Sequence, residues 1–190
     1  MKEMLSYLAA ALPARTSAPA RLLALQCALR STASGRVQLP AGLLAGMRTT
    51  AEARAQLEDT GWMVSGTSGP GLDARLADPV LLARAPGRRA RCRSAEWALQ
   101  VCRAPALRTT TPSSQLLALT LAAQLPQGDL HTLTDRGALA YVSNLDAGQL
   151  QEHLDLLLAS GFLRCWSFDR RSGDLSWSVD AGAIPARAGT

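Results

Sequence analysis

The chain has 190 residues, of which 47% are hydrophobic, 18% charged and 4% aromatic. This composition excludes a chain that is disordered over most of its length, and the length is enough for one large domain or two small ones. Apolar runs such as residues 116–125 are shorter than the roughly 20 residues that cross a bilayer. The first residues, with Glu3 and Arg15, do not fit a secretory signal. We therefore expect a cytoplasmic protein.

Positive charge is concentrated in the first part of the chain. Residues 1–111 hold 15 basic and 7 acidic side chains, a net charge of +8, whereas residues 112–190 hold 5 and 8, a net charge of −3. This asymmetry predicts that the first part meets a polyanion and that the second part meets a different partner.

An internal repeat divides the chain at about the same place. Residues 22–25, Leu-Leu-Ala-Leu, recur as residues 116–119, and each copy opens an apolar helical stretch after a proline and small polar residues. Glycines that suit a turn follow at Gly35 and Gly128. The pattern predicts two copies of one module, with a longer second helix over 135–142 in the second copy.

The end of each copy repeats as well. Residues 57–63 and 157–163 both read as a helix end, a glycine suited to left-handed backbone, and a large apolar pair that begins a strand. In the second copy, 162–168 and 175–179 alternate as half-buried strands do, and the polar residues 169–174 between them suit a hairpin tip. The first copy has matching short strands over 62–64 and 72–76. The expected order is helix, helix, helix, hairpin.

The stretch 145–164 resembles the recognition helix and first wing strand of bacterial winged helix-turn-helix regulators of the ArsR and MarR type. A capping polar residue starts the helix, His153-Leu154 lies in its middle, and Leu157 and Gly161 lead into two apolar residues. The resemblance implies a mainly α fold with small β-hairpin wings (α+β), built from two winged helix-turn-helix modules in tandem. We expect the core of the second module to bury four residues together: Leu154, Leu157, Phe162 and Trp177.

The repeat and the resemblance together predict five segments. These are an N-terminal helix over 1–17, a basic first winged-helix module over 18–80, an Arg-rich linker with a short helix over 81–111, an acidic second winged-helix module over 112–182, and a flexible tail over 183–190.

Winged helices of this family lay their third helix in the major groove and their wing along the adjacent backbone. In the first module the resemblance therefore assigns DNA contacts to Arg48, Thr49 and Thr50 at the start of this helix and to Arg54 one turn on. Thr50 is equally suited to be only a helix N-cap.

The densest basic cluster lies between the modules. Arg88, Arg89, Arg91 and Arg93 precede a short helix over 95–102 that Ser94 is suited to cap. Four charges in six residues can neutralise several phosphates, as an arm in the minor groove or along the backbone. The alternative is a solvated linker in a chain that uses Arg almost to the exclusion of Lys.

The second module offers fewer cations. Its recognition helix exposes Glu152 and Asp155, which repel phosphates, so a solvated or protein-bound face competes with DNA binding as the interpretation. The DNA candidates here are Arg136, Gln149, His153 and the wing pair Arg170 and Arg171.

No catalytic or metal-binding pattern stands out. The sequence lacks GxSxG, P-loop, GxGxxG and HExxH motifs, and its four cysteines form no CxxC pair. We expect no enzyme activity, no cofactor and no metal, and we expect the cysteines to be small buried residues.

These observations favour a protein that binds double-stranded DNA. Its expected class is a bacterial transcriptional regulator, and its expected location is the cytoplasm, in association with the nucleoid. The alternative is a winged-helix protein-protein interaction adaptor, since tandem winged helices also resemble accessory subunits of chromosome-condensing complexes and plasmid replication or partition proteins; the acidic second module would then bind protein. Apolar residues at helical spacing near the N-terminus suit a homodimer, as the family often forms, whereas two modules in one chain also suit a monomer.

Overall fold

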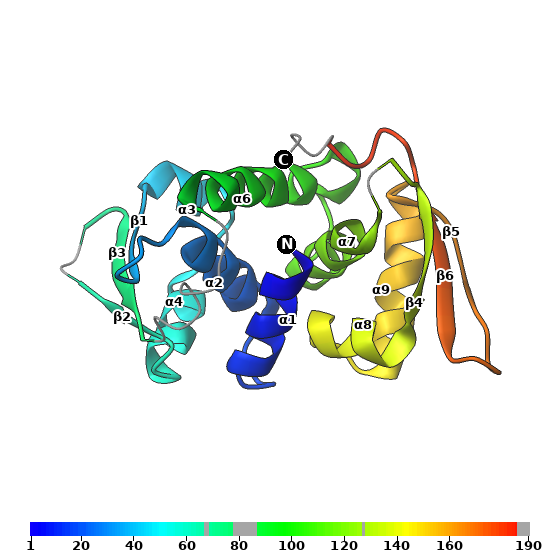
Figure 1. Cartoon of the computed structure of the whole chain (residues 1–190), viewed down its shortest axis with the longest axis horizontal. Helices are drawn as coiled ribbons and strands as arrows, with labels where there is room; N and C mark the ends of the chain where they lie inside the picture. Colours follow the sequence, from blue (N-terminus) through cyan, green and yellow to red (C-terminus); the bar gives the residue numbers. More distant parts are fainter. Residues whose placement is uncertain (67–68, 78–86, 127, 186–190) are drawn as a thin grey trace. The chain divides into compact units, whose positions relative to one another are not determined.

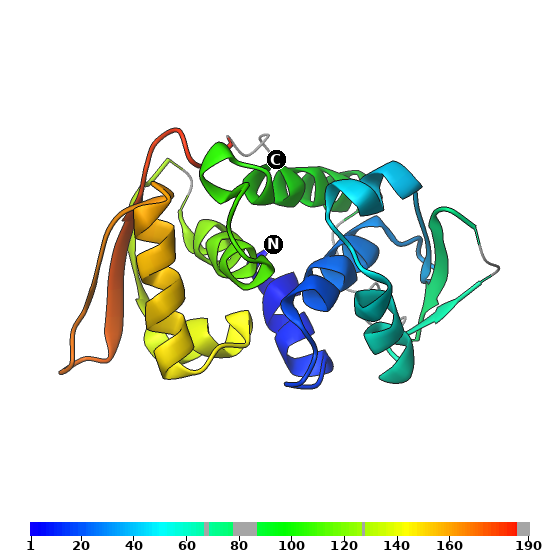
Figure 2. The same ribbon diagram turned by 180° about the vertical axis from the view of Figure 1, so that it is seen from behind.

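The computed structural model spans Met1–Thr190 and describes residues 1–66, 69–77, 87–126 and 128–185 (Figures 1 and 2). The chain divides into two compact units, Ala10–Glu96 and Met1–Ala9 with Trp97–Gly189. The division falls inside two helices, α1 (Lys2–Ala11) and α6 (Arg88–Cys102), so each of them contributes residues to both units.

Each unit contains one winged-helix module, and the two modules have the same order of elements. Both sheets are antiparallel and three-stranded, with strand orders β1-β3-β2 and β4-β6-β5. The internal repeat is thus confirmed, as is the α+β fold with two winged helices in tandem. The first module consists of α2 (Ala18–Arg30), β1 (Arg36–Leu39), α3 (Ala41–Gly46), α4 (Ala51–Asp59), β2 (Met63–Ser65) and β3 (Leu72–Leu76). The second consists of α7 (Pro112–Gln124), β4 (His131–Asp135), α8 (Arg136–Ser143), α9 (Ala147–Ala159), β5 (Leu163–Phe168) and β6 (Asp174–Val179), and a 3₁₀ turn, η1 (Pro105–Leu107), precedes it.

The strands β1 and β4 correct the expected order of helix, helix, helix, hairpin. Each follows the first helix of its module and pairs with the last strand, Val37 opposite Ala74 and Leu133 opposite Ser176. The sequence does not predict these strands, because four or five alternating residues between a glycine turn and the next helix give too short a periodic signal.

The first helix of each module is the centre of its core. In α2 nine residues are buried, and in α7 nine are buried as well. A helix that is apolar on all sides has to be covered on all sides. In the second module α9 packs against α7, α8 and β5, so the sheet lies on one side of α9 and the helices on the other (Figures 1 and 2).

Capping residues and glycines fix the ends of the third helices. The side chain of Thr50 accepts a hydrogen bond from the backbone N–H of Ala53, and Asp146 forms a capping box with Gln149. Gly61 and Gly161 follow the helices with φ of 67° and 79°, the left-handed backbone that their spacing predicts. The chain then turns directly into β2 and β5.

Cysteine burial departs in part from the expectation. Cys27 is fully buried, and this burial raises the pKa of its thiol to about 12. Cys92 and Cys102 are half-buried, whereas Cys165 is exposed on β5, with Sγ 3.1 Å from Oγ of Ser178. In the described part of the chain, no three His, Cys, Asp or Glu side chains gather in a group that could hold a metal ion.

The first residues of the predicted tail, 183–185, pack against the rest of their unit. Ala183 is buried, and the carbonyl of Pro185 accepts a hydrogen bond of 3.0 Å from Nε1 of Trp97. Residues 186–190 of this tail and 81–86 of the predicted linker lie outside the described residues. Among the helices that the structure describes, none is long and apolar enough to cross a membrane.

The core of the second module makes the first prediction. Leu154, Leu157, Phe162 and Trp177 are each at most 1% exposed, as the sequence predicts. Changing Leu157 to Ala leaves a cavity and should lower the free energy of unfolding by roughly 2–5 kcal/mol, measured by urea denaturation. Changing the exposed Leu158 in the same helix should have a much smaller effect. Equal losses from the two changes would contradict this packing.

Candidate nucleic-acid interface

The turn between α3 and α4 brings three of the predicted DNA residues together. Arg48 is exposed and has a left-handed backbone, with φ of 54°. The N–H of Thr49 donates to the carbonyl of Leu44 at 3.1 Å, which closes the turn. The Thr50 hydroxyl is the N-cap of α4, so the capping role is confirmed. Contacts of these residues with DNA stay a prediction.

Arg54 lies in a network within its own module. Its Nε is 2.9 Å from a carboxylate oxygen of Glu58 and donates to Oγ of Ser65 on β2 at 3.2 Å. The Ser65 hydroxyl also donates to Glu58. The hydrogen bond from Ser65, and after it the one from Arg54, lowers the pKa of the Glu58 carboxyl. The guanidinium therefore ties α4 to the wing, and a neighbouring carboxylate offsets its charge.

The surface of α4 is acidic, although residues 1–111 carry a net charge of +8. Glu52, Glu58 and Asp59 are exposed on this helix of nine residues, and Arg54 is its one cation. Phosphates are repelled by such a face. The net charge of residues 1–111 therefore does not describe the recognition helix of the first module.

The Arg-rich cluster is helical rather than an extended arm. The helix α6 begins at Arg88, seven residues earlier than expected, so Ser94 lies inside it and does not cap it. Arg, Ala and Glu all favour helix over these positions. The side chains of Arg88, Arg89 and Arg93 are exposed and can reach phosphates.

Arg91 has a different role from its neighbours. It is 7% exposed, and its Nη2 donates at 2.8 Å to the carbonyl of Ser31, the C-cap residue that follows α2. This bond satisfies a buried carbonyl at a helix end. The predicted phosphate contact of Arg91 does not fit its burial, so Arg91 is not part of the candidate interface.

The predicted base readers of α9 make contacts inside the second module. Oε1 of Gln149 accepts a hydrogen bond of 3.0 Å from the N–H of Asp146, in the capping box. His153 is half-buried, and its Nδ1 lies 2.9 Å from Oγ of the buried Ser114 on α7. His153 thus packs α9 on α7, whereas Gln149 keeps its exposed amide N–H₂ at the start of α9.

The second module has a cavity of about 210 Å³ between α9 and the wing. Arg136 and Phe168 both line this cavity, and the guanidinium carbon of Arg136 lies 4.6 Å from the centroid of the Phe168 ring. Nη2 of Arg136 also donates to the carbonyl of Ala147 at 3.0 Å. Arg170 lines the cavity, whereas Arg171 does not. The remaining lining residues are Leu150, Gln151, Leu154, Trp166 and Leu175. The cavity therefore joins an apolar floor to two guanidinium groups.

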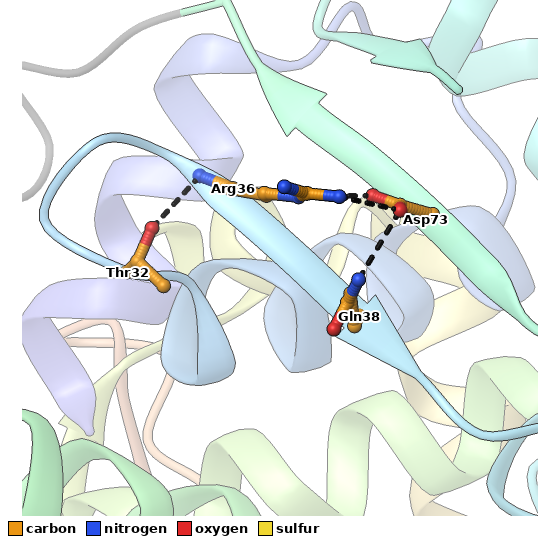
Figure 3. A network of polar contacts seen from close by, with 4 residues as sticks. All are labelled: Thr32, Arg36, Gln38 and Asp73. Carbon is orange, nitrogen blue, oxygen red and sulfur yellow. Dashed lines mark hydrogen bonds and ion pairs between the residues drawn. The ribbon is translucent and has the colours of Figure 1, made fainter.

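The sequence does not predict a polar network that lies on the sheet of the first module. Asp73 on β3 accepts hydrogen bonds from Nη2 of Arg36 at 3.0 Å and from Nε2 of Gln38 at 3.2 Å, and the Thr32 hydroxyl accepts one from the N–H of Arg36 (Figure 3). The bonds from Arg36 and Gln38 lower the pKa of the Asp73 carboxyl. The alternation of Arg36 and Gln38 with apolar residues is the one sequence feature that indicates a strand with these two side chains on its exposed face.

The contrast between Arg91 and Arg89 makes the second prediction. Changing Arg91 to Ala leaves the buried carbonyl of Ser31 without this donor and should lower the free energy of unfolding by about 1–3 kcal/mol. Changing the exposed Arg89 to Ala should alter it by less than about 0.5 kcal/mol. Chemical denaturation of both variants measures the difference, and a stable Arg91 variant would show that the bond to Ser31 is dispensable.

Comparison with known proteins supports the fold. No protein-family model matches the chain, and no curated protein matches its sequence. Among solved structures, the chain is similar to the crystal structure of Pi initiator protein in complex with iteron DNA, with a TM-score of 0.53 and 11% identity. The likeness covers 93% of this chain and 95% of the Pi initiator chain, so it extends over both modules. It does not single out the ArsR and MarR families.

Proposed function

We propose that this chain binds double-stranded DNA through its two winged helices, as an initiator of replication that recognises repeated sites. The observation that carries the proposal is the similarity to the Pi initiator, which is bound to iteron DNA and which this chain matches over nearly its whole length. A regulator of transcription would bind DNA with the same modules, but the comparison supports it less directly.

Exposed and half-buried arginines supply the phosphate contacts in this proposal. In the first unit these are the exposed Arg48 at the turn before α4, with Arg88, Arg89 and Arg93 on α6. In the second, the half-buried Arg136 and the exposed Arg170 line the cavity beside α9, and the exposed Arg171 lies at the wing tip. Such contacts give affinity that falls as salt rises. A protein that acts on the duplex belongs with the nucleoid in the cytoplasm.

Titration of a labelled random duplex at two salt concentrations tests DNA binding. Salt-dependent affinity supports the proposal, whereas an adaptor that binds only protein should show no salt-dependent binding to the duplex. Sedimentation of the free protein at several concentrations separates a homodimer from a monomer.

Selection of bound fragments from genomic DNA then tests the class of DNA-binding protein. An initiator should enrich a fragment that carries several copies of one short sequence. Enrichment of single, scattered sites beside genes would instead favour a regulator of transcription.

The basic start of α6 makes the third prediction. Each phosphate contact contributes about 0.9 to the slope of log affinity against log salt, so changing both Arg88 and Arg89 to Ala should flatten this slope by up to about 2. Changing the exposed Arg15, which lies in the same unit but outside the proposed surface, is the control and should leave the slope nearly unchanged. An unchanged slope in the double variant would remove α6 from the interface.

The wing of the second module makes the fourth prediction. Arg170 lines the cavity beside α9, and the adjacent Arg171 does not, although both are exposed. Changing Arg170 to Ala should flatten the salt slope by about 0.9. Changing Arg171 to Ala removes the same charge and should have a smaller effect. Equal effects would show that the cavity has no part in binding.

A further inference from the structure

The solvent face of the sheet in the first module carries two arginines directly opposite each other. Arg36 on β1 pairs in register with Arg75 on β3, and both side chains are exposed, while Val37, Leu39, Leu72, Ala74 and Leu76 on the other face are buried. Val64 on β2 completes this row on the far side of Arg75 and is 66% exposed. Like charges directly opposite destabilise an antiparallel pair.

Only one of the two charges is offset within the described residues. Asp73 binds Arg36 and Gln38 along β1 (Figure 3), with Nε of Arg36 also donating at 3.4 Å. In the same part of the chain, no carboxylate lies within 4.0 Å of the Arg75 guanidinium. The row therefore keeps one uncompensated cation in its middle strand.

This face is also hollowed. Arg36, Arg75 and Val64 line an open depression of about 590 Å³. The remaining lining residues are mostly small, and leave the two arginines accessible: Ser34, Ser65, Gly66, Asp73 and Ala74. A group as large as a phosphate can approach both guanidinium groups without displacing a bulky side chain.

The charge of α4 decides which surface of the module faces phosphates. Glu52, Glu58 and Asp59 are exposed on this helix, and Glu58 offsets its Arg54. The module therefore attracts a polyanion more favourably along its sheet than along its third helix. Arg is the side chain best suited to hold a phosphate, because its donors form a fixed fork.

We propose that the solvent face of the sheet β1-β3-β2 binds a backbone phosphate, with Arg75 as the main ligand and Arg36 beside it. The identification of the polyanion as duplex DNA rests on the proposed function. The proposal gives the first module a mode of DNA contact through its sheet rather than through its third helix.

Two changes of opposite sign test this site. Arg75→Ala should weaken duplex binding and flatten the salt slope by about 0.9, so that raising salt from about 50 to 200 mM costs about 3.5-fold less affinity than in the unchanged protein. Asp73→Asn removes the carboxylate beside the site and should raise the affinity at low salt. Arg15→Ala, which removes an equal charge elsewhere in the unit, controls for net charge.

Melting temperature separates binding from folding. Since Arg75 faces a like charge and its side chain is exposed, Arg75→Ala should keep or raise the melting temperature while it weakens binding. A lower melting temperature with unchanged affinity would show that Arg75 has a structural role and would overturn the proposal.

Parallel titrations with inorganic tripolyphosphate and with a polyglutamate peptide separate this site from the proposed function. If the unchanged protein binds no duplex, the proposed function fails, and the site is then upheld only if Arg75→Ala weakens tripolyphosphate binding and Asp73→Asn strengthens it. If the protein binds duplex but neither variant alters binding of duplex or tripolyphosphate, the site fails alone. If Arg75→Ala weakens the binding of polyglutamate but not of duplex or tripolyphosphate, the ligand of this site is an acidic polypeptide, and the phosphate proposal is overturned.

Discussion

The burial of one apolar helix in each module is the constraint on which the rest of the structure depends. Both α2 and α7 are apolar around most of their circumference, so each needs cover on every side. Two of their buried polar side chains find partners within the same unit: Gln26 donates to the carbonyl of Ala95 on α6, and Thr120 donates to that of Leu116 in its own helix. The sheet and the third helix of each module contribute to this cover with one face, and their other face is exposed to solvent.

The sequence predicts those features of the fold that depend on neighbouring residues. The repeat, the cap at Thr50, and the glycines Gly61 and Gly161 are all confirmed, because each reflects a local conformational requirement. The strands β1 and β4 were not predicted, since their stability comes from pairing with β3 and β6, which lie some 40 residues further along the chain.

Site residues were harder to predict than the fold, because charge counted along the chain does not indicate which face a side chain joins. Arg91 and Arg89 are two positions apart in one helix, yet one is buried against Ser31 and the other is exposed. Arg54 belongs to the basic half, but Glu58 and Ser65 hold it. The opposed arginines Arg36 and Arg75 could be recognised only once the register of β1 and β3 was known.

Arginine has two physical uses in this chain, and separating them decides where a polyanion can bind. Buried arginines donate to backbone carbonyls: Arg21 to that of Thr16 at 3.1 Å and Arg91 to that of Ser31 at 2.8 Å. These guanidinium groups bind backbone carbonyls at the end of α2 and in the loop before it and contribute little to an outer surface, so the net charge of the first half overstates the positive charge that is available to a polyanion. The available charge lies instead on exposed cations such as Arg75 and Arg89, which contribute nothing evident to the core. A surface that keeps like charges side by side at a cost in stability is more readily explained by binding than by folding.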